Sequence, residues 1–210
     1  MSSKDYFNQV ASQWDEMRTA FYSEAVRERA YVVAGVSAGQ VAADIGAGTG
    51  FVAEGLVKRG LHVICVDQSE AMLDELRKKF AEAKNVEYRL GEAESLPIQD
   101  ASLDAVFANM YLHHVEDPAK AIGEMARPLK PGGRLVITDM DEHGFEFLIS
   151  EHHDRWMGFV RQDVRRWFGE AGLLDVAVDN VGERCSSQSS SGDVIASVSL
   201  FVALGIKPEL

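Results

Sequence analysis

The sequence predicts an α/β protein in which helices cover both faces of a largely parallel sheet. Two observations support this fold class. Short apolar runs alternate with helical patterns from residue 41 to residue 138, and the runs are apolar throughout instead of alternating with polar residues. With 210 residues, 46% of them hydrophobic, the chain is long enough for one domain with its own core, so 1–210 is predicted to be a single domain.

The N-terminal residues 1–38 are predicted to be helical. Apolar and aromatic residues recur there at helical spacing: Tyr6, Phe7, Val10, Trp14 and Met17. Ser3 is positioned to cap the first helix. A second helix is expected over 22–36, ending near Gly35 and Gly39.

Seven strands are predicted beyond this segment, at residues 41–45, 61–66, 86–90, 103–108, 134–138, 176–181 and 194–203. Helical patterns connect them at 51–59, 69–80, 118–127 and 161–171, with Ser69 as a cap of the second helix and a turn at Pro131–Gly133. Residues 140–160 interrupt the alternation and are predicted to be an insertion. The polar residues Cys185–Gly192 are expected to form a flexible loop, which makes the last two strands an antiparallel hairpin.

Composition excludes several classes of function. The formal net charge of −12 argues against nucleic acid and against an anionic membrane surface as partners. Only two cysteines are present, Cys65 and Cys185, so a reducing compartment is expected. The N-terminus lacks the apolar core of a signal peptide, and no apolar run has the length of a membrane span, so a cytoplasmic location is predicted.

The strongest local signal is the glycine cluster after the first predicted strand, in the segment Asp44–Gly50. Glycines at the end of a strand let the backbone turn tightly and let a ligand approach closely. The spacing is G-x-G-x-G, whereas a dinucleotide loop reads G-x-G-x-x-G. Asp44 would repel a phosphate and attract a cation. Asp67, at the end of the second strand, is suited to accept hydrogen bonds from the two hydroxyls of a ribose.

These residues resemble the class I S-adenosylmethionine-dependent methyltransferases, in the small-molecule branch that includes the ubiquinone/menaquinone C-methyltransferases. The segments that carry the resemblance are VAADIGAGTG at 41–50, VICV followed by Asp67, GEAESLP at 91–97, LDAVFANMYLHHV at 103–115, and ARPLKPGGRLVITD ending at Asp139. The resemblance implies a Rossmann-like, doubly wound sheet of seven strands with the last strand antiparallel. It also implies S-adenosylmethionine as the methyl donor, S-adenosylhomocysteine as its product, and in-line transfer of the methyl group to a small molecule.

The resemblance also assigns the residues that contact the methyl donor. The glycine loop borders the methionine half, Asp67 holds the ribose, Glu92 and Ala93 frame the adenine, and Asn109 and Met110 border the sulfonium. An aspartate is commoner than Glu92 at its position. The full predicted set is Asp44, Gly46, Ala47, Gly48, Thr49, Gly50, Asp67, Gln68, Met72, Glu92, Ala93, Asn109 and Met110.

The methyl acceptor is predicted to lie between the N-terminal helices, acting as a lid over a core at 39–139, and the insertion at 140–160, with 161–210 supplying a C-terminal helix and hairpin. The candidate contacts are Tyr6, Trp14, Tyr22, Tyr111, His152 and Trp156. A base is required only if the acceptor must lose a proton, and the candidates are His113, His114, His143 and His152. No metal site is predicted, because the histidine spacings match no closed zinc site.

Three alternatives stay open at this point. The first is an NAD-dependent oxidoreductase, which the glycine spacing and Asp44 disfavour. The second is a non-catalytic protein that keeps the fold. The third, within the methyltransferases, is methylation of a nucleic acid, which the net charge disfavours. A homodimer is compatible with the sequence.

Overall fold

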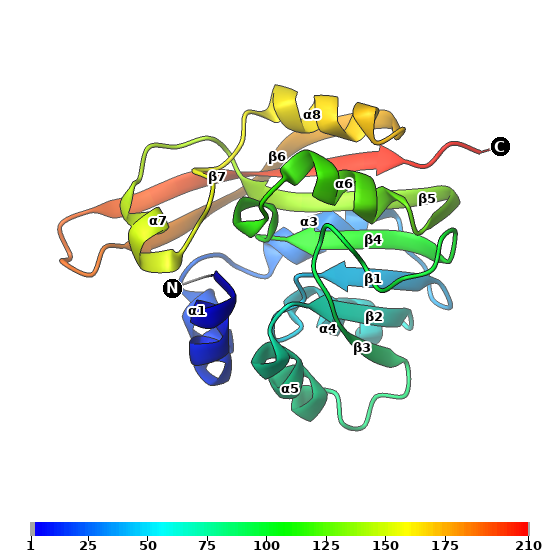
Figure 1. Ribbon diagram of the computed structural model, residues 1–210, viewed down its shortest axis with the longest axis horizontal. Helices are drawn as coiled ribbons and strands as arrows, with labels where there is room; N and C mark the ends of the chain where they lie inside the picture. Colours follow the sequence, from blue (N-terminus) through cyan, green and yellow to red (C-terminus); the bar gives the residue numbers. More distant parts are fainter. Residues whose placement is uncertain (1–2, 210) are drawn as a thin grey trace.

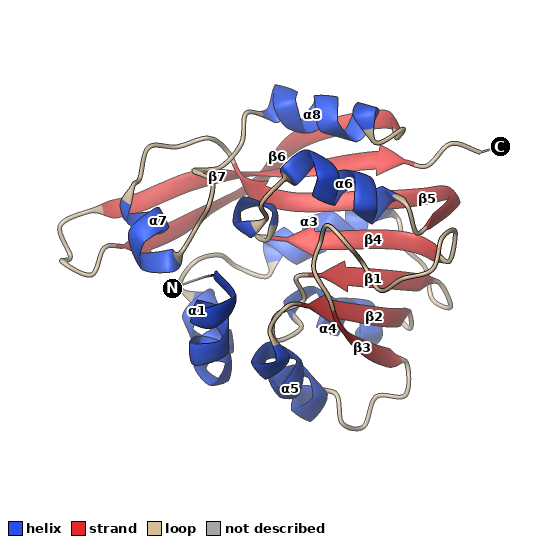
Figure 2. Ribbon diagram, viewed as in Figure 1, coloured by secondary structure: helices blue, strands red, loops and turns tan. Residues whose placement is uncertain are grey.

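A computed structural model describes residues 3–209 and contains one seven-stranded sheet (Figures 1 and 2). The strands are β1 (Val41–Ile45), β2 (His62–Asp67), β3 (Val86–Leu90), β4 (Leu103–Asn109), β5 (Leu129–Met140), β6 (Leu174–Gln188) and β7 (Ile195–Ile206). Their order is β3-β2-β1-β4-β5-β7-β6, and β7 runs antiparallel to both of its neighbours. The predicted fold class is therefore confirmed, including the antiparallel last strand.

Helices cover both faces of this sheet. Successive residues of a strand point to opposite faces, and because those of the buried strands are apolar on both, each face needs a cover. Ala43 faces a core shared with α6 (Pro118–Ala126) and α8 (Arg161–Glu170), while Ala42 faces a core shared with α3 (Ala25–Ala34) and α4 (Phe51–Lys58). Figure 1 shows α6 and α8 in front of the sheet and α3 and α4 behind it. The remaining elements are α1 (Ser3–Val10), η1 (Ala11–Gln13), α2 (Trp14–Thr19), α5 (Glu70–Lys79), η2 (Leu112–His114) and α7 (Phe147–His152).

Local capping explains where several helices begin and end. The Ser69 hydroxyl accepts a hydrogen bond from the Met72 amide and starts α5 as predicted. Asp117 caps α6 in the same way, with Pro118 in the first turn. Gly35 ends α3 in the left-handed conformation.

Three local predictions were wrong. Ser3 lies inside α1, and its buried hydroxyl has no hydrogen-bond partner among the described residues, so it is not the cap. Pro131–Gly133 belongs to β5 and does not form a separate turn, because the backbones of Gly132 and Gly133 pair with Lys207. The polar residues from Cys185 to Gln188 continue β6, because they pair in register with Ile195–Val198, which shortens the predicted loop.

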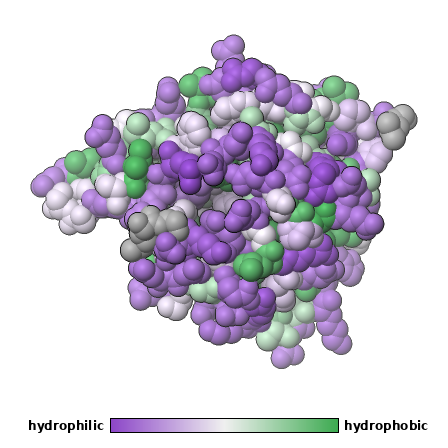
Figure 3. Space-filling view, in the orientation of Figure 1, coloured by the Kyte–Doolittle hydropathy of each residue, from purple (hydrophilic) through white to green (hydrophobic). Residues whose placement is uncertain are grey.

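The visible surface is largely polar. Figure 3 shows a face that is mostly hydrophilic, with apolar residues scattered over it. Among residues 3–209, no helix combines the length and apolar character needed to cross a bilayer.

Two helical glycines predict opposite responses to alanine. A Cβ at Gly55 in α4 would lie 2.4 Å from the Tyr31 hydroxyl, which donates a hydrogen bond to the Val52 carbonyl. Gly55→Ala is therefore expected to destabilise the fold by about 1–3 kcal/mol through overpacking. Gly123→Ala in α6, where nothing lies within 4 Å, should stabilise it by up to ~1 kcal/mol. Urea unfolding of both variants measures this, and a neutral Gly55→Ala would contradict the packing at this site.

Candidate active site

The glycine loop joins the end of β1 to α4 and is held against β2. Gly46, Gly48 and Gly50 all have positive φ angles, of 67°, 53° and 88°, which explains why glycine occurs at each position. The amides of Gly46 and Ala47 both donate to the Val66 carbonyl. These bonds fix the loop at the carboxyl ends of two neighbouring strands, where α/β sheets bind ligands.

Asp67 lies at the end of β2 and connects three backbone segments. One carboxylate oxygen accepts from the Gly48 amide at 2.8 Å, and the other accepts from the Ser69 amide at 2.8 Å. Asp67 is 7% exposed and lines a cavity next to the glycine loop. Its carboxylate oxygens can accept further hydrogen bonds from a ligand in that cavity. Burial raises the pKa of Asp67, and the backbone hydrogen bonds oppose that effect.

Asp44 is the second buried carboxylate of this loop. It is 2% exposed and accepts a hydrogen bond from the Ala53 amide in the first turn of α4, at 2.9 Å. Burial raises the pKa of Asp44 to about 7, and the nearby charge of Asp67 adds to the increase. Two carboxylates in one cavity favour a ligand that carries positive charge.

Most residues predicted to contact the methyl donor line this cavity, which we call the loop cavity. They are Asp44, Gly46, Ala47, Gly48, Thr49, Asp67, Gln68, Met72, Asn109 and Met110. Three predicted contacts lie outside it. A Cβ at Gly50 would point at Phe80, Glu92 lines a shallower groove with Gln68, and Ala93 is 1% exposed. The roles of all thirteen residues as donor contacts stay predictions.

Aromatic rings fill much of the loop cavity. A Cβ at Gly46 would lie 2.3 Å from the ring of Tyr111, and one at Gly48 would lie 3.5 Å from Trp14 Nε1. The Thr49 hydroxyl donates to Asp15 at 2.5 Å, which holds α2 over the loop. The remaining water-accessible volume is about 50 Å³, enough for only a few waters. The rings of Tyr111 and Trp14 therefore narrow the space beside the glycine loop.

A second cavity adjoins the first and is lined largely by aromatic and apolar side chains. We call it the aromatic cavity. It lies between α1, α7, η2 and β6, and it shares Phe7, Trp14, Tyr22, Met110 and His114 with the loop cavity. Of the predicted acceptor contacts, Tyr6, Trp14, Tyr22 and His152 line it, while Tyr111 lines only the loop cavity.

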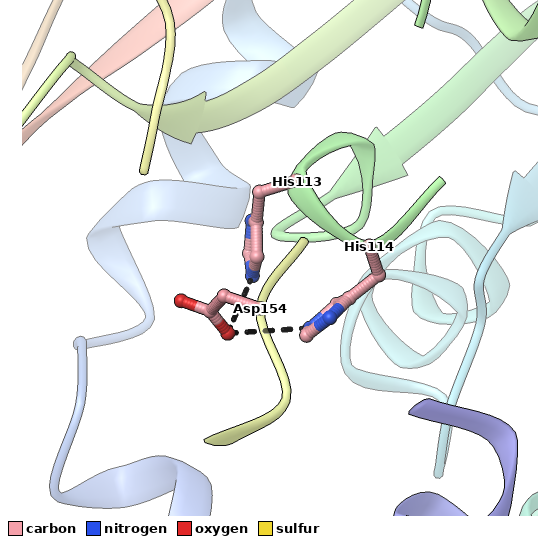
Figure 4. A group of neighbouring side chains, drawn as sticks. All are labelled: His113, His114 and Asp154. Atoms are coloured by element: carbon pink, nitrogen blue, oxygen red, sulfur yellow. Dashed lines mark ion pairs between the residues drawn. The ribbon is translucent and has the colours of Figure 1, made fainter. Parts of the chain in front are cut away.

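His113 lines the aromatic cavity and is 4% exposed. Figure 4 shows its ring directed toward Asp154. Its Nδ1 lies 2.7 Å from Asp139 Oδ1 at the end of β5, and its Nε2 lies 3.7 Å from Asp154 Oδ1. Burial by itself would lower the pKa of His113, but the two carboxylates raise it to about 9. Burial raises the pKa of Asp154 to about 6, and His113 opposes that shift.

His114 turns toward the same carboxylate, with Nε2 4.0 Å from Asp154 Oδ1. One ligand atom each from His113, His114 and Asp154 lies within 4.8 Å of the others, a spacing that could accommodate a divalent cation. A protonated His113 between Asp139 and Asp154 supplies the same positive charge without a metal. The expectation that the chain has no metal site stays a prediction.

Of the remaining predicted residues, His143 and Trp156 lie outside both cavities. His143 lines neither cavity, and its Nδ1 accepts from the Phe145 amide. Trp156 is 39% exposed and donates to the Val115 carbonyl. His152 does line the aromatic cavity, 3.0 Å from the Ser187 hydroxyl.

Sequence patterns did not bring Asp139 and Asp154 together with His113. Asp139 ends a predicted parallel strand, and that position was a usable signal. Asp154 is 41 positions from His113, and no motif relates the two residues.

Comparisons with known proteins identify a methyltransferase family. Residues 43–137 match a family model described as "Methyltransferase domain". A demethylmenaquinone methyltransferase from Renibacterium salmoninarum is 34% identical over 210 aligned residues, covering 90% of this chain and 87% of that protein. The chain belongs to the class I S-adenosylmethionine-dependent methyltransferases.

Other relatives of this methyltransferase match over less of their length. A demethylmenaquinone methyltransferase from Clavibacter sepedonicus is 37% identical over 59% of this chain and 50% of that protein. An uncharacterized methyltransferase from Mycobacterium tuberculosis, Rv3342, is 46% identical over 57% of this chain and 43% of that protein. The chain therefore spans about half the length of these curated relatives.

Solved structures share the methyltransferase fold at lower identity. The YcgJ protein of Bacillus subtilis superimposes with a TM-score of 0.71 at 21% identity, over 89% of this chain and 99% of that one. The [4+2]-cyclase SpnF superimposes with a TM-score of 0.77 at 16% identity, over 99% and 95%. At these identities the likeness concerns the fold alone.

The raised pKa of Asp44 predicts that Asp44→Asn stabilises the protein in a pH-dependent way. Above pH 7 the folded protein holds a buried charge, whereas the unfolded chain ionises near pH 3.8 in water. The folded state therefore loses stability as the pH rises from about 4 to 7. Asn can still accept from the Ala53 amide, so the stability gain should be largest above pH 7 and vanish near pH 4.

Chemical unfolding at pH 4, 6 and 8 tests this expectation. Asp104→Asn is the matched control, because Asp104 is paired with Lys130 and the pKa of its carboxyl is lowered. That variant should lose stability at pH 8. A loss at pH 8 in Asp44→Asn as well would show that Asp44 is held as a satisfied charge.

Proposed function

We propose that this protein transfers a methyl group from S-adenosylmethionine, bound in the loop cavity, to a small molecule bound in the aromatic cavity. The observation that carries the proposal is that the two cavities meet. Trp14, Met110 and His114 line both of them. In-line displacement requires the donor carbon and the acceptor atom to approach across such a junction.

The residues of the loop cavity fit the methyl donor chemically. When bound, S-adenosylmethionine supplies a methyl carbon activated by a positively charged sulfur. Asp67 offers carboxylate oxygens to the ribose hydroxyls from a side chain already oriented by two backbone amides. Asp44 places a buried carboxylate where a cationic ligand is favoured over a phosphate.

The aromatic cavity supports a small, largely apolar acceptor. Its walls include Phe7, Phe21, Tyr22 and Leu148, which offer apolar contact area to a flat molecule. Relatives named for demethylmenaquinone and for ubiquinone biosynthesis favour the same class of acceptor. The net charge of −12 disfavours a nucleic acid acceptor.

A second candidate is a different reaction on the same fold. The likeness to the cyclase SpnF shows that this fold also occurs in a protein named for a different reaction. An NAD-dependent oxidoreductase is disfavoured by the two buried carboxylates beside the glycine loop, because they would repel a pyrophosphate. Titration with NADH in parallel with S-adenosylhomocysteine distinguishes the oxidoreductase from the methyltransferase.

Calorimetric titration with S-adenosylhomocysteine tests the donor site. Asp67→Ala should weaken binding about 10- to 100-fold, because it removes charge-assisted hydrogen bonds of about 1.5–3 kcal/mol. Asp74→Ala is the matched control, since Asp74 is an exposed carboxylate on α5 and its loss makes the same change in charge. Equal affinities in all three proteins would remove Asp67 from the donor site.

Tryptophan fluorescence tests whether the ligand binds beside Trp14. Binding of S-adenosylhomocysteine should change the emission of Trp14, which lies against Gly48. Trp14→Phe should lose most of this change, whereas Trp167→Phe, on α8, should keep it. A response that survives Trp14→Phe would place the ligand elsewhere.

A further inference from the structure

We infer that His113, His114 and Asp154 bind one divalent transition-metal ion, with an open coordination position that faces the aromatic cavity. The histidine spacings in the sequence predicted no metal site, so this inference comes from the tertiary structure. It goes beyond the proposed function and does not depend on it, because the three ligands belong to the protein and need neither methyl donor nor acceptor.

The ring of His113 is oriented by a buried carboxylate on its far side. Asp139 is 0% exposed, and its Oδ1 lies 2.7 Å from His113 Nδ1, while its Oδ2 accepts from the His113 backbone amide at 3.3 Å. Histidines that bind metals commonly donate one ring nitrogen to a carboxylate or a carbonyl and bind the ion through the other. Nε2 is therefore the ring atom of His113 that is directed toward Asp154 (Figure 4).

The ring of His114 is oriented by a backbone carbonyl. Its Nδ1 lies 3.4 Å from the His153 carbonyl oxygen, which can only accept, so Nδ1 is the donor and Nε2 carries the lone pair. Adjacent residues of an α-helix do not face each other, but η2 is a single turn of 3-10 helix. The rings of His113 and His114 lie 4.1 Å apart between centroids, so both rings belong to one cluster.

Asp154 brings one carboxylate oxygen to both rings. Its Oδ1 lies 3.7 Å from His113 Nε2 and 4.0 Å from His114 Nε2, and one ligand atom from each residue lies within 4.8 Å of the others. Two atoms that each bind one ion at about 2.0–2.2 Å are roughly 3.3–4.3 Å apart. An ion between the three side chains therefore requires shifts of about half an ångström or less.

Backbone hydrogen bonds hold this carboxylate in place. The amides of Arg155 and Trp156 both donate to the His113 carbonyl, at 2.9 and 3.1 Å, and fix the segment after α7 against η2. Asp154 itself is 6% exposed. The three ligands are thus positioned by the folded chain before any ion binds, which lowers the cost of binding.

The alternative occupant of this place is a proton on His113 Nε2. Such a proton pairs the ring with Asp154, and the buried carboxylates on both sides favour it when no metal is present. It leaves His114 Nε2 without a hydrogen-bond donor among residues 3–209. A divalent ion displaces this proton and accepts electron pairs from all three ligand atoms, so it satisfies the whole cluster.

The ligand types select the class of ion. Imidazole nitrogens suit Zn²⁺, Fe²⁺ and Co²⁺, whereas Mg²⁺ and Ca²⁺ prefer oxygen ligands alone. Three protein ligands leave at least one position open on a four-coordinate ion. Because His113, His114 and Asp154 all line the aromatic cavity, that open position faces the cavity.

Titration with Co²⁺ tests the site in the wild-type protein. The full-length chain, prepared without a histidine tag, is freed of metal with a chelator and titrated at neutral pH. One Co²⁺ per chain should give the strong visible absorption of a four- or five-coordinate ion, and Zn²⁺ should abolish it by displacement. Azide, a small anion, should shift the absorption bands because it can enter the open position.

Variants distinguish this cluster from the other histidines. Asp139→Asn, a positioning change, should weaken Zn²⁺ binding about 10- to 100-fold. His114→Gln and Asp154→Asn each change a ligand and should weaken binding at least as much. His62→Gln, at the exposed start of β2, is the matched control and should bind Zn²⁺ like wild type. Urea unfolding without metal shows which variants are folded.

Four results would overturn the inference. These are no visible absorption from Co²⁺ in the wild-type protein, bands that azide does not shift, a spectrum that survives His114→Gln, and an affinity that Asp139→Asn leaves unchanged. Titration of the metal-free protein with S-adenosylhomocysteine reports separately on the proposed function, so the two can fail independently.

Discussion

The hydrogen bond from the Gly48 amide to the Asp67 carboxylate joins the two strand ends on which the site is built. It links the loop after β1 to the end of β2, and the second oxygen of the same carboxylate orients the start of α5. The loop can reach Asp67 only because its glycines adopt positive φ angles. Asp67 therefore has two roles, because the carboxylate that could bind a ligand also holds the glycine loop that forms one wall of the cavity.

The buried carboxylates of this site reduce the stability of the folded protein. Asp44 and Asp67 lie in one cavity, and burial raises the pKa of both. An apolar pair of similar size would avoid that desolvation penalty. The arrangement is reasonable if a positively charged ligand offsets the penalty on binding, so the local instability is consistent with a cation-binding role.

The acceptor side is built differently, from segments that the sequence separates. Helices α1 and α2, the turn η2, the insertion with α7, and the extended strand β6 each supply part of the aromatic cavity. Two backbone hydrogen bonds to the His113 carbonyl hold the insertion in place. Variation in these segments can change the acceptor while the sheet and the glycine loop stay the same.

By itself, the sequence determined the parallel sheet, the hairpin at its end, the glycine loop and Asp67, because these depend on local patterns. The other predicted residues of the loop cavity came from the resemblance to a known family. Apolar runs, capping residues such as Ser69 and closely spaced glycines act within a few residues of one another. It did not predict that β6 continues through polar residues, since that depends on backbone pairing with β7. Only the tertiary structure placed Asp139 and Asp154 on either side of His113, because contacts between distant segments leave no periodic or motif signal in a single chain.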